Sequence, residues 1–71
     1  MSMEKTIEFF GTKAGKIWEA LRDGPKTMTQ LQKVTGMTQK EVCMGLGWLA
    51  REGKIIVTNF EGMHLRFQLT E

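Results

Sequence analysis

The sequence has 71 residues, of which 41% are hydrophobic and 25% are charged, as expected for one small globular domain. A chain of this length buries only about 60% of the surface it would expose when unfolded, so we expect one thin core and no deep cleft. No apolar run approaches the roughly 18 residues of a membrane span, and no apolar segment follows residues 1–5 as it would in a secretory signal. These features predict a cytoplasmic protein that does not enter a membrane.

The residues that most often carry chemistry are scarce. The single cysteine, Cys43, excludes an internal disulfide and a zinc site built on several thiolates, and the single histidine, His64, argues against a Ser/His triad. Cys43 is expected to be a small half-buried residue and His64 an exposed strand residue. We therefore predict that the chain is not an enzyme, with no catalytic residue, no metal, no cofactor and no small-molecule substrate.

Positive charge is concentrated in the middle of the sequence. The net charge is only +2, but residues 11–40 contain six basic and two acidic residues, whereas residues 41–71 contain three basic and four acidic ones. A basic segment is compatible with contacts to phosphate groups. Solvated helix faces have the same appearance, so charge alone leaves both interpretations open.

The first predicted element is a helix that ends at the Asp23-Gly24-Pro25 stop signal. We expect it to run from about Thr12 to Arg22, with a start nearer Thr6 as the alternative. In the first case residues 1–10 form a loosely ordered or extended N-terminal segment. The helix is predicted from apolar residues at spacings of three and four, which share one face beside Trp18: Ile7, Phe10, Ala14, Ile17 and Leu21.

Two capping boxes predict two further helices. Thr29 with Gln32 opens a short helix from about Gln30 to Thr35, and Thr38 with Glu41 opens a longer one from Gln39 to about Glu52. Gly36 suits a left-handed position between them, and Gly53 closes the second helix. The residues expected to face the core are Leu31 and Val34 in the first helix and Val42, Leu46, Leu49 and Ala50 in the second.

The last third of the sequence changes to a strand-like period of two. Ile55 to Thr58 and Met63 to Thr70 alternate apolar and polar residues around a turn at Asn59 to Gly62, and Lys26 to Met28 could add a third strand. The predicted order is therefore helix, short strand, helix, helix, strand, strand. We predict one winged helix-turn-helix domain over residues 1–71, mainly α, with three helices and a two- to three-stranded antiparallel sheet.

Two motifs carry a resemblance to known proteins. The segment LxxVTGM at 31–37, followed by VxxxLxxL at 42–49 and EGKI at 52–55, resembles the winged helix-turn-helix pattern of prokaryotic regulators. More narrowly, GxxAGxIWxxL at 11–21 and LGWLAREGKI at 46–55 resemble a family of small stand-alone bacterial and archaeal winged-helix domains of unknown function. This resemblance spans about Gly11 to Leu69. It implies the fold, homodimers and a DNA-binding role, and it supplies no functional residues.

The helix after the turn is expected to enter the major groove of double-stranded DNA. At 100° per residue, with Val42 facing the core, the residues that point away are Lys40, Met44, Gly47 and Arg51, with Cys43 and Trp48 on opposite flanks. The middle of this helix, at Met44, Gly47 and Trp48, is poor in hydrogen-bonding side chains, and Phe60 and Glu61 in the turn of the predicted hairpin, or wing, weaken the case for DNA. Ordinary solvation is an equal alternative for the basic residues. The candidate nucleic-acid contacts are Thr29, Thr38, Gln39, Lys40 and Arg51, with Lys26, Lys33 and Arg66 nearby for phosphates.

Two helix-interior glycines suggest close contacts. Each of Gly45 and Gly47 lowers the stability of the helix by up to about 1 kcal/mol relative to alanine. Gly45 could admit the first helix or its Trp18, while the outward Gly47 is better explained by a partner. The candidate homodimer or partner interface is Met44, Gly47, Trp48, Phe9 and Phe60. Two hypotheses follow: a homodimeric DNA-binding regulator of transcription, or a protein-interaction module on the same fold that binds no DNA.

Overall fold

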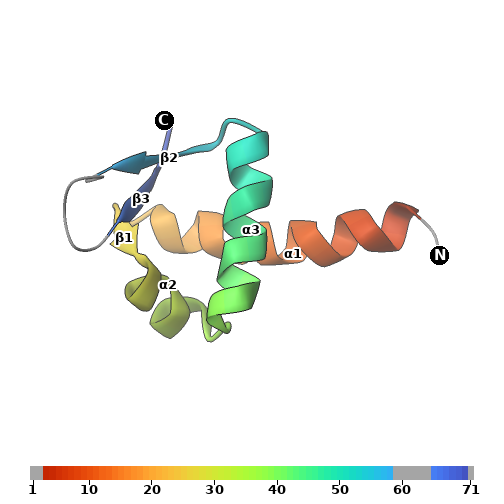
Figure 1. Cartoon of the computed structure of the whole chain (residues 1–71), viewed down its shortest axis with the longest axis horizontal. Helices are drawn as coiled ribbons and strands as arrows, with labels where there is room; N and C mark the ends of the chain where they lie inside the picture. The colour runs from red at the N-terminus through yellow and green to blue at the C-terminus, as the bar shows by residue number, and fades with distance from the viewer. Residues whose placement is uncertain (1–2, 59–64, 71) are drawn as a thin grey trace.

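The computed structural model describes residues 3–58 and 65–70. Three helices and a three-stranded antiparallel sheet make up this part of the chain (Figure 1), so the predicted winged helix-turn-helix arrangement is confirmed. The elements are α1 (Met3–Leu21), β1 (Lys26–Thr27), α2 (Met28–Thr35), α3 (Gln39–Arg51), β2 (Ile55–Thr58) and β3 (Arg66–Leu69).

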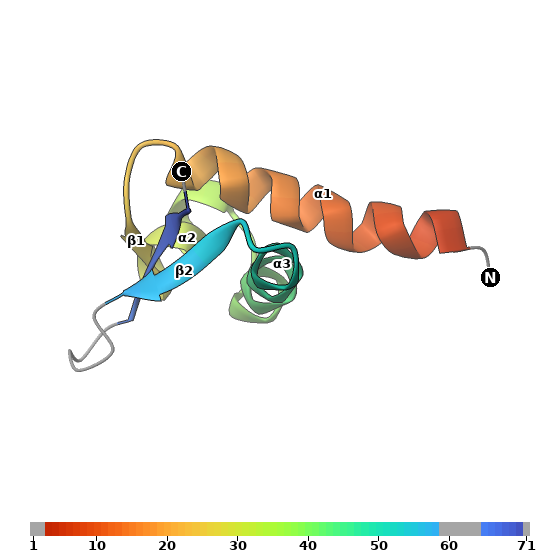
Figure 2. The same cartoon turned by 90° about the horizontal axis from the view of Figure 1, so that it is seen from above.

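Helix α1 is longer than its sequence pattern alone specified. It begins at Met3, before both expected starts, so residues 3–10 are helical and the extended alternative for this segment is wrong. At 1.5 Å per residue its 19 residues span about 28 Å. Figures 1 and 2 show that its N-terminal half projects beyond the rest of the fold. The apolar stripe is therefore buried at Ala14, Ile17 and Leu21, but Ile7 is 50% exposed.

The start of α2 corrects the first predicted capping box. The N-cap is Thr27, not Thr29: its extended backbone (φ −85°, ψ 170°) lets its hydroxyl accept from Gln30 N while Gln30 Oε1 accepts from Thr27 N. Both threonines are followed three residues later by glutamine, so spacing could not separate them. Pairing of Thr27 with Arg66 in the sheet holds its backbone extended, which an N-cap requires.

The corner between α2 and α3 forms as predicted. Gly36 adopts the left-handed conformation (φ 73°) and its N–H donates to Gln32 O at 2.9 Å. Helix α3 begins at the predicted N-cap, Thr38, and Gly53 follows it with a positive φ of 72°. The backbone therefore turns twice at glycines, and α3 crosses α1 between these turns (Figure 1).

The sheet lies at the C-terminal end of α1, with the strand order β1-β3-β2 (Figures 1 and 2). Strand β3 is central: Phe67 pairs with Lys26 of β1 and with Val57 of β2. The third strand expected at Lys26 to Met28 is thus confirmed, but it ends at Thr27 because Met28 begins α2. The predicted turn at 59–62, together with Met63 and His64, lies outside the described residues, and Leu65, expected on the apolar face, is 44% exposed.

The core is centred on the crossing of the helices. Ile17, Leu31 and Val42, one from each helix, are the largest completely buried side chains, and Ile55 and Phe67 close the core from the sheet. Two predictions of buried residues are wrong. Val34 is 59% exposed because α2 turns Leu31 inward with Met28 beside it, and Ala50 is exposed because the buried face of α3 is centred on Val42, Gly45, Leu46 and Leu49.

Candidate functional site

The outward face of α3 is the first candidate surface. Lys40 and Arg51 are eleven residues apart, which places them within about 20° of each other around the helix and about 16 Å apart along it. Both are exposed, as are Cys43 and Gly47 between them. The expectation that Cys43 is half-buried is therefore wrong. This face has a basic residue near each end and small side chains in the middle.

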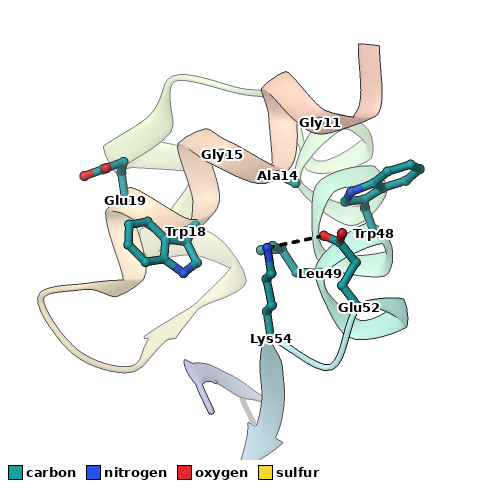
Figure 3. Close-up of a pocket in the computed structure, with 9 residues that line it drawn as sticks. All are labelled: Gly11, Ala14, Gly15, Trp18, Glu19, Trp48, Leu49, Glu52 and Lys54. Atoms are coloured by element: carbon teal, nitrogen blue, oxygen red, sulfur yellow. Dashed lines mark ion pairs between the residues drawn. The ribbon is translucent and has the colours of Figure 1, made fainter. Parts of the chain in front are cut away.

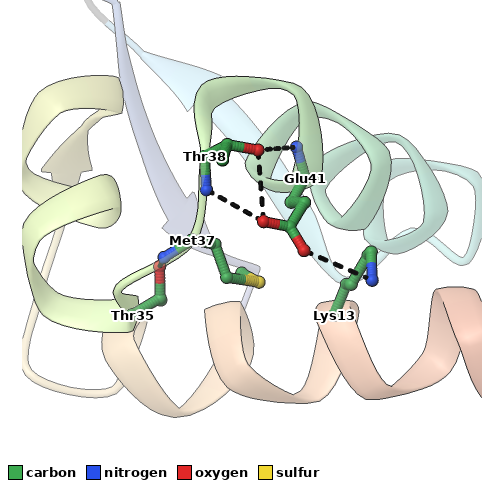
Figure 4. A network of polar contacts seen from close by, with 5 residues as sticks. All are labelled: Lys13, Thr35, Met37, Thr38 and Glu41. Atoms are coloured by element: carbon green, nitrogen blue, oxygen red, sulfur yellow. Dashed lines mark hydrogen bonds and ion pairs between the residues drawn. The ribbon is translucent and has the colours of Figure 1, made fainter.

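A network of polar contacts fixes the N-terminal end of α3 (Figure 4). The Thr38 hydroxyl accepts from Glu41 N and donates to Glu41 Oε1, both at 3.2 Å, and Thr38 N donates to the same carboxylate at 3.1 Å. The second carboxylate oxygen of Glu41 lies 3.6 Å from Lys13 Nζ on α1. Because the Thr38 hydroxyl already makes two bonds, its role in this structure is to hold the helix start.

Lys13 connects this network to the exposed part of α1. Its Nζ lies 3.9 Å from the centroid of the Phe9 ring as well as beside Glu41. Hydrogen bonds from Thr38 to the carboxylate, first from its backbone and then from its side chain, lower the pKa of Glu41, and Lys13 lowers it further. This role of Lys13 was not predicted from the sequence, because no local spacing pattern relates residues so far apart in the chain.

The remaining candidate cations lie on α2 and the sheet. Lys33 is exposed on α2, and Thr29 is exposed within its first turn. Arg66 is exposed on β3 opposite Thr27, while Lys26, next along β1, is half-buried. Because successive strand residues point to opposite faces, Arg66 shares its face with Thr27, the N-cap of α2, whereas Lys26 shares the other face with the buried Phe67. Gln39 is exposed in the first turn of α3.

Ion pairs divide the basic residues into two groups. Lys13, Arg22 and Lys54 each pair with a glutamate, at 3.6, 3.3 and 3.9 Å. Within residues 3–58 and 65–70, none of the five candidate cations on β1, α2, α3 and β3 forms an ion pair. These five are Lys26, Lys33, Lys40, Arg51 and Arg66.

The charge of the helices divides in the same way. Residues 3–25, which contain α1, have four basic and four acidic residues. Residues 26–51, which contain α2 and α3, have four basic residues and only one acidic residue, Glu41. Since Lys13 of α1 neutralises Glu41, the helix-turn-helix side of the molecule carries unbalanced positive charge.

The predicted interface residues are less exposed than the sequence suggested. Trp48 does not point freely into solvent: it is half-buried and its ring stacks on Phe10 of α1, with centroids 5.9 Å apart and 2° between the planes. Met44 is also half-buried, whereas Gly47 is exposed and Phe9 is 49% exposed. Phe60 lies outside the described residues.

The glycines of α3 have different surroundings. A Cβ at Gly45 would meet the side chain of Ile17, the Lys13 carbonyl carbon at 3.0 Å and the Ala14 nitrogen at 3.1 Å, so this glycine admits α1 as predicted. Among the described residues, apart from its chain neighbours and the nearby backbone of α3 itself, no atom lies within 4 Å of a Cβ at Gly47. The cost of Gly45 is therefore explained by the fold, and that of Gly47 is not.

A second candidate surface is a groove of about 300 Å³ between α1 and α3. Figure 3 shows the rings of Trp18 and Trp48 on its two sides, with Gly11, Ala14 and Gly15 along α1 between them. We call it the tryptophan groove. The Glu52–Lys54 ion pair lies at its end near the sheet.

The part of the chain that the structure describes has neither a metal cluster nor a membrane-spanning helix. In it, no three histidine, cysteine, aspartate or glutamate side chains gather as they would around a metal ion. None of the described helices is both long and apolar enough to span a bilayer.

Comparison with known proteins identifies the family to which this chain belongs. Residues 3–67 match the family described as a winged helix-turn-helix domain (DUF2582), and the chain belongs to this family. It is 44% identical over 58 residues to the uncharacterized protein MJ1608 of Methanocaldococcus jannaschii, a match covering 78% of this chain and 83% of the relative.

Two solved structures share the fold. Protein BT2368 from Bacteroides thetaiotaomicron, solved by NMR in solution, has a TM-score of 0.79 and 25% identity over 90% of this chain and 78% of its own. The crystal structure of Rv0081 from M. tuberculosis has a TM-score of 0.73 and 20% identity, covering 96% of this chain and 72% of that one. The second likeness is one of fold alone.

Proposed function

We propose that this chain is a cytoplasmic, homodimeric winged-helix regulator that binds double-stranded DNA with α3 in the major groove. The observation that carries the proposal is the division of charge between the helices. The basic residues of β1, α2, α3 and β3 have no ion-pair partner among the described residues, while the acidic residue of α3 is neutralised by α1. Cations without an ion-pair partner favour contacts with phosphates.

The geometry of α3 suits this role. The major groove is about 12 Å wide, and Lys40 and Arg51 lie about 16 Å apart on one face of the helix. With α3 in the groove, these two residues would lie near the phosphates that border it on opposite strands. Lys33 on α2, and Arg66 on β3 opposite the N-cap of α2, would extend the contact along the backbone.

The proposed contact is dominated by phosphates rather than bases. Cys43 and Gly47, exposed in the middle of α3, offer little hydrogen bonding to base edges. Gln39, Lys40 and Thr29 are the exposed side chains that could add base contacts at the helix starts. We therefore expect a modest preference for particular sequences and a strong dependence of affinity on salt.

The test is the salt dependence of binding to a random duplex. Lys40→Ala with Arg51→Ala should reduce the slope of log K against log salt by about 0.9 for each phosphate that is no longer neutralised, or nearly 2 for the pair in each protomer of the dimer. The matched control is Lys16→Ala with Arg22→Ala, which removes the same charge from exposed positions of α1 and the turn after it. Equal slopes for the two double variants, or no binding by the parent at low salt, would refute the proposal.

A second candidate function is a protein-interaction module that binds no DNA. The observation in its favour is the apolar surface of α1, where Met3 is 71% and Ile7 50% exposed. Apolar patches of this kind mark contact surfaces. A parent protein that self-associates or captures a protein partner, yet shows no salt-dependent binding to duplex, would favour this function.

A further inference from the structure

The N-terminal half of α1 has an apolar face that its own chain does not cover. The face that buries Ala14, Ile17 and Leu21 continues to Phe10, Ile7 and Met3, where the helix projects beyond α3 (Figure 1). Phe10 is covered in part by its stack on Trp48. Ile7 and Met3, further out, stay 50% and 71% exposed. Helical proteins bury such a stripe against another element, so it needs a partner.

The spacing along this face is that of paired helices. Ile7, Gly11, Ala14 and Trp18 follow one another at four, three and four residues, which is the a/d spacing of helices packed side by side. Glycine at such a position lets two helix backbones approach closely. Within the described residues, apart from chain neighbours and the nearby backbone of α1 itself, no atom lies within 4 Å of a Cβ at Gly11 or Gly15, so neither glycine is required by packing in its own chain.

We propose that the exposed half of α1 docks in the tryptophan groove of a second copy of this chain. The two α1 helices run antiparallel and cross near Gly11, so the contact is reciprocal. Ile7 and Met3 of each copy lie over Gly15 and against Trp18 of the other. This inference rests on the homodimer in the proposed function and names its interface, but it does not require that DNA is bound.

The groove has the dimensions and lining that this occupant needs. It offers about 300 Å³ between two indole rings, with small residues along α1 at its base (Figure 3). Trp18 is still 38% exposed and would be covered by the second helix. The exposed and the receptive parts lie on one helix face, which is the condition for an isologous two-fold contact.

The exposed apolar area on α1 sets the expected affinity of the dimer. The exposed fractions of Met3, Ile7 and Trp18 together amount to about one and a half large side chains, or roughly 250–350 Å² of apolar surface per copy. A standard interface buries about 800 Å² per partner, of which about 57% is apolar. The α1 contact supplies more than half of that apolar part, so we expect a dimer that dissociates on dilution.

The test is sedimentation of the full chain over a range of concentrations from about 1 to 500 μM. Ile7→Glu should raise the dimer dissociation constant roughly ten- to a hundredfold, because a charged side chain then replaces an apolar one at both ends of the reciprocal contact. The matched control is Thr12→Glu, which adds the same charge to an exposed position on the opposite side of α1 and should leave the constant unchanged.

Two further measurements test whether the variants fold and whether they still bind DNA. By circular dichroism, both variants must have the same helix content as the parent protein. If Ile7→Glu has less helix, Met3→Glu repeats the test one turn earlier in α1. Duplex binding of Ile7→Glu is measured in parallel, so loss of the dimer and loss of DNA binding are seen independently. A parent that is monomeric at every concentration, or equal dissociation constants for Ile7→Glu and Thr12→Glu, would overturn the α1 interface.

Discussion

Replacing Gly45 by alanine tests whether α1 and α3 cross as closely as the structure indicates. In an open helix this change would stabilise the protein by about 1 kcal/mol, because alanine is the better helix former. At Gly45 the added Cβ would instead lie 3.0 Å from the Lys13 carbonyl carbon and 3.1 Å from the Ala14 nitrogen. These are backbone atoms, which cannot rotate away, and the Ile17 side chain that it would also meet is completely buried.

The magnitude follows from the balance of two effects. Overpacking a core costs about 1–3 kcal/mol, and contact with backbone atoms places this site in the upper part of that range. After subtraction of about 1 kcal/mol of helix propensity, Gly45→Ala should lower the free energy of unfolding by about 1–2 kcal/mol. A domain of this length has a free energy of unfolding of about 4–10 kcal/mol, so this loss is a substantial fraction of its stability.

Gly47→Ala is the matched control on the same helix. It adds the same methyl group where no described atom lies within 4 Å, so it should raise the stability by about 0.5–1 kcal/mol. Thermal denaturation followed by circular dichroism measures both variants, and their melting temperatures should differ by roughly 10–20 °C. If Gly45→Ala proves as stable as the parent or more so, the close crossing of α1 and α3 is wrong.

Four further substitutions test the helix caps and the corner. Thr27→Ala should cost about 1 kcal/mol in thermal denaturation, whereas Thr29→Ala should leave stability the same or raise it by a few tenths; equal losses would contradict the Thr27 cap. Because folding lowers the pKa of Glu41, its stabilising effect is complete above the ordinary Glu pKa, about 4.3, and is lost as the pH falls through the folded value. The stability difference between the parent and Glu41→Gln, from urea titrations at several pH values, should therefore shrink in acid; a constant difference would exclude this linkage. Gly36→Ala should lose about 1–2 kcal/mol, since alanine is strained at a φ of 73°, and an unchanged urea midpoint would show that this strain is absent.

The order of elements and the corner between the helices were predictable because their signals are local. A threonine with a glutamate three residues later defines the start of α3, and Gly36 defines the end of α2, without reference to the rest of the chain. The same local rule failed at α2, where Thr27 and Thr29 both satisfy it. Only the pairing of Thr27 with β3 decides between them, and strand pairing is a long-range property.

The candidate surfaces were predicted less completely than the fold. A helical wheel for α3 correctly placed Lys40, Gly47 and Arg51 outward, because that calculation needs only the identity of the buried side. It could not show that Phe10 covers one face of Trp48, since the contact depends on how α1 crosses α3. For the same reason the periodicity of α1 placed Ile7 on one face with the buried Ala14 and Ile17 but did not show that Ile7 itself is 50% exposed: a sequence stripe gives the apolar face of a helix but not where its partner ends.

Four glycines lie inside helices, and the fold explains only one of them. Each costs up to about 1 kcal/mol relative to alanine, yet among the described residues only Gly45 has another element close against it. Gly11 and Gly15 lie along the tryptophan groove, and Gly47 lies in the middle of the proposed DNA-binding face of α3. The two proposed surfaces have no residue in common, so a dimer formed through α1 leaves every candidate cation available. Substitutions at the two surfaces should therefore have different effects on dimerisation. Alanine at Gly11 or Gly15 should stabilise the monomer while weakening the dimer, and alanine at Gly47 should stabilise the monomer without affecting dimerisation.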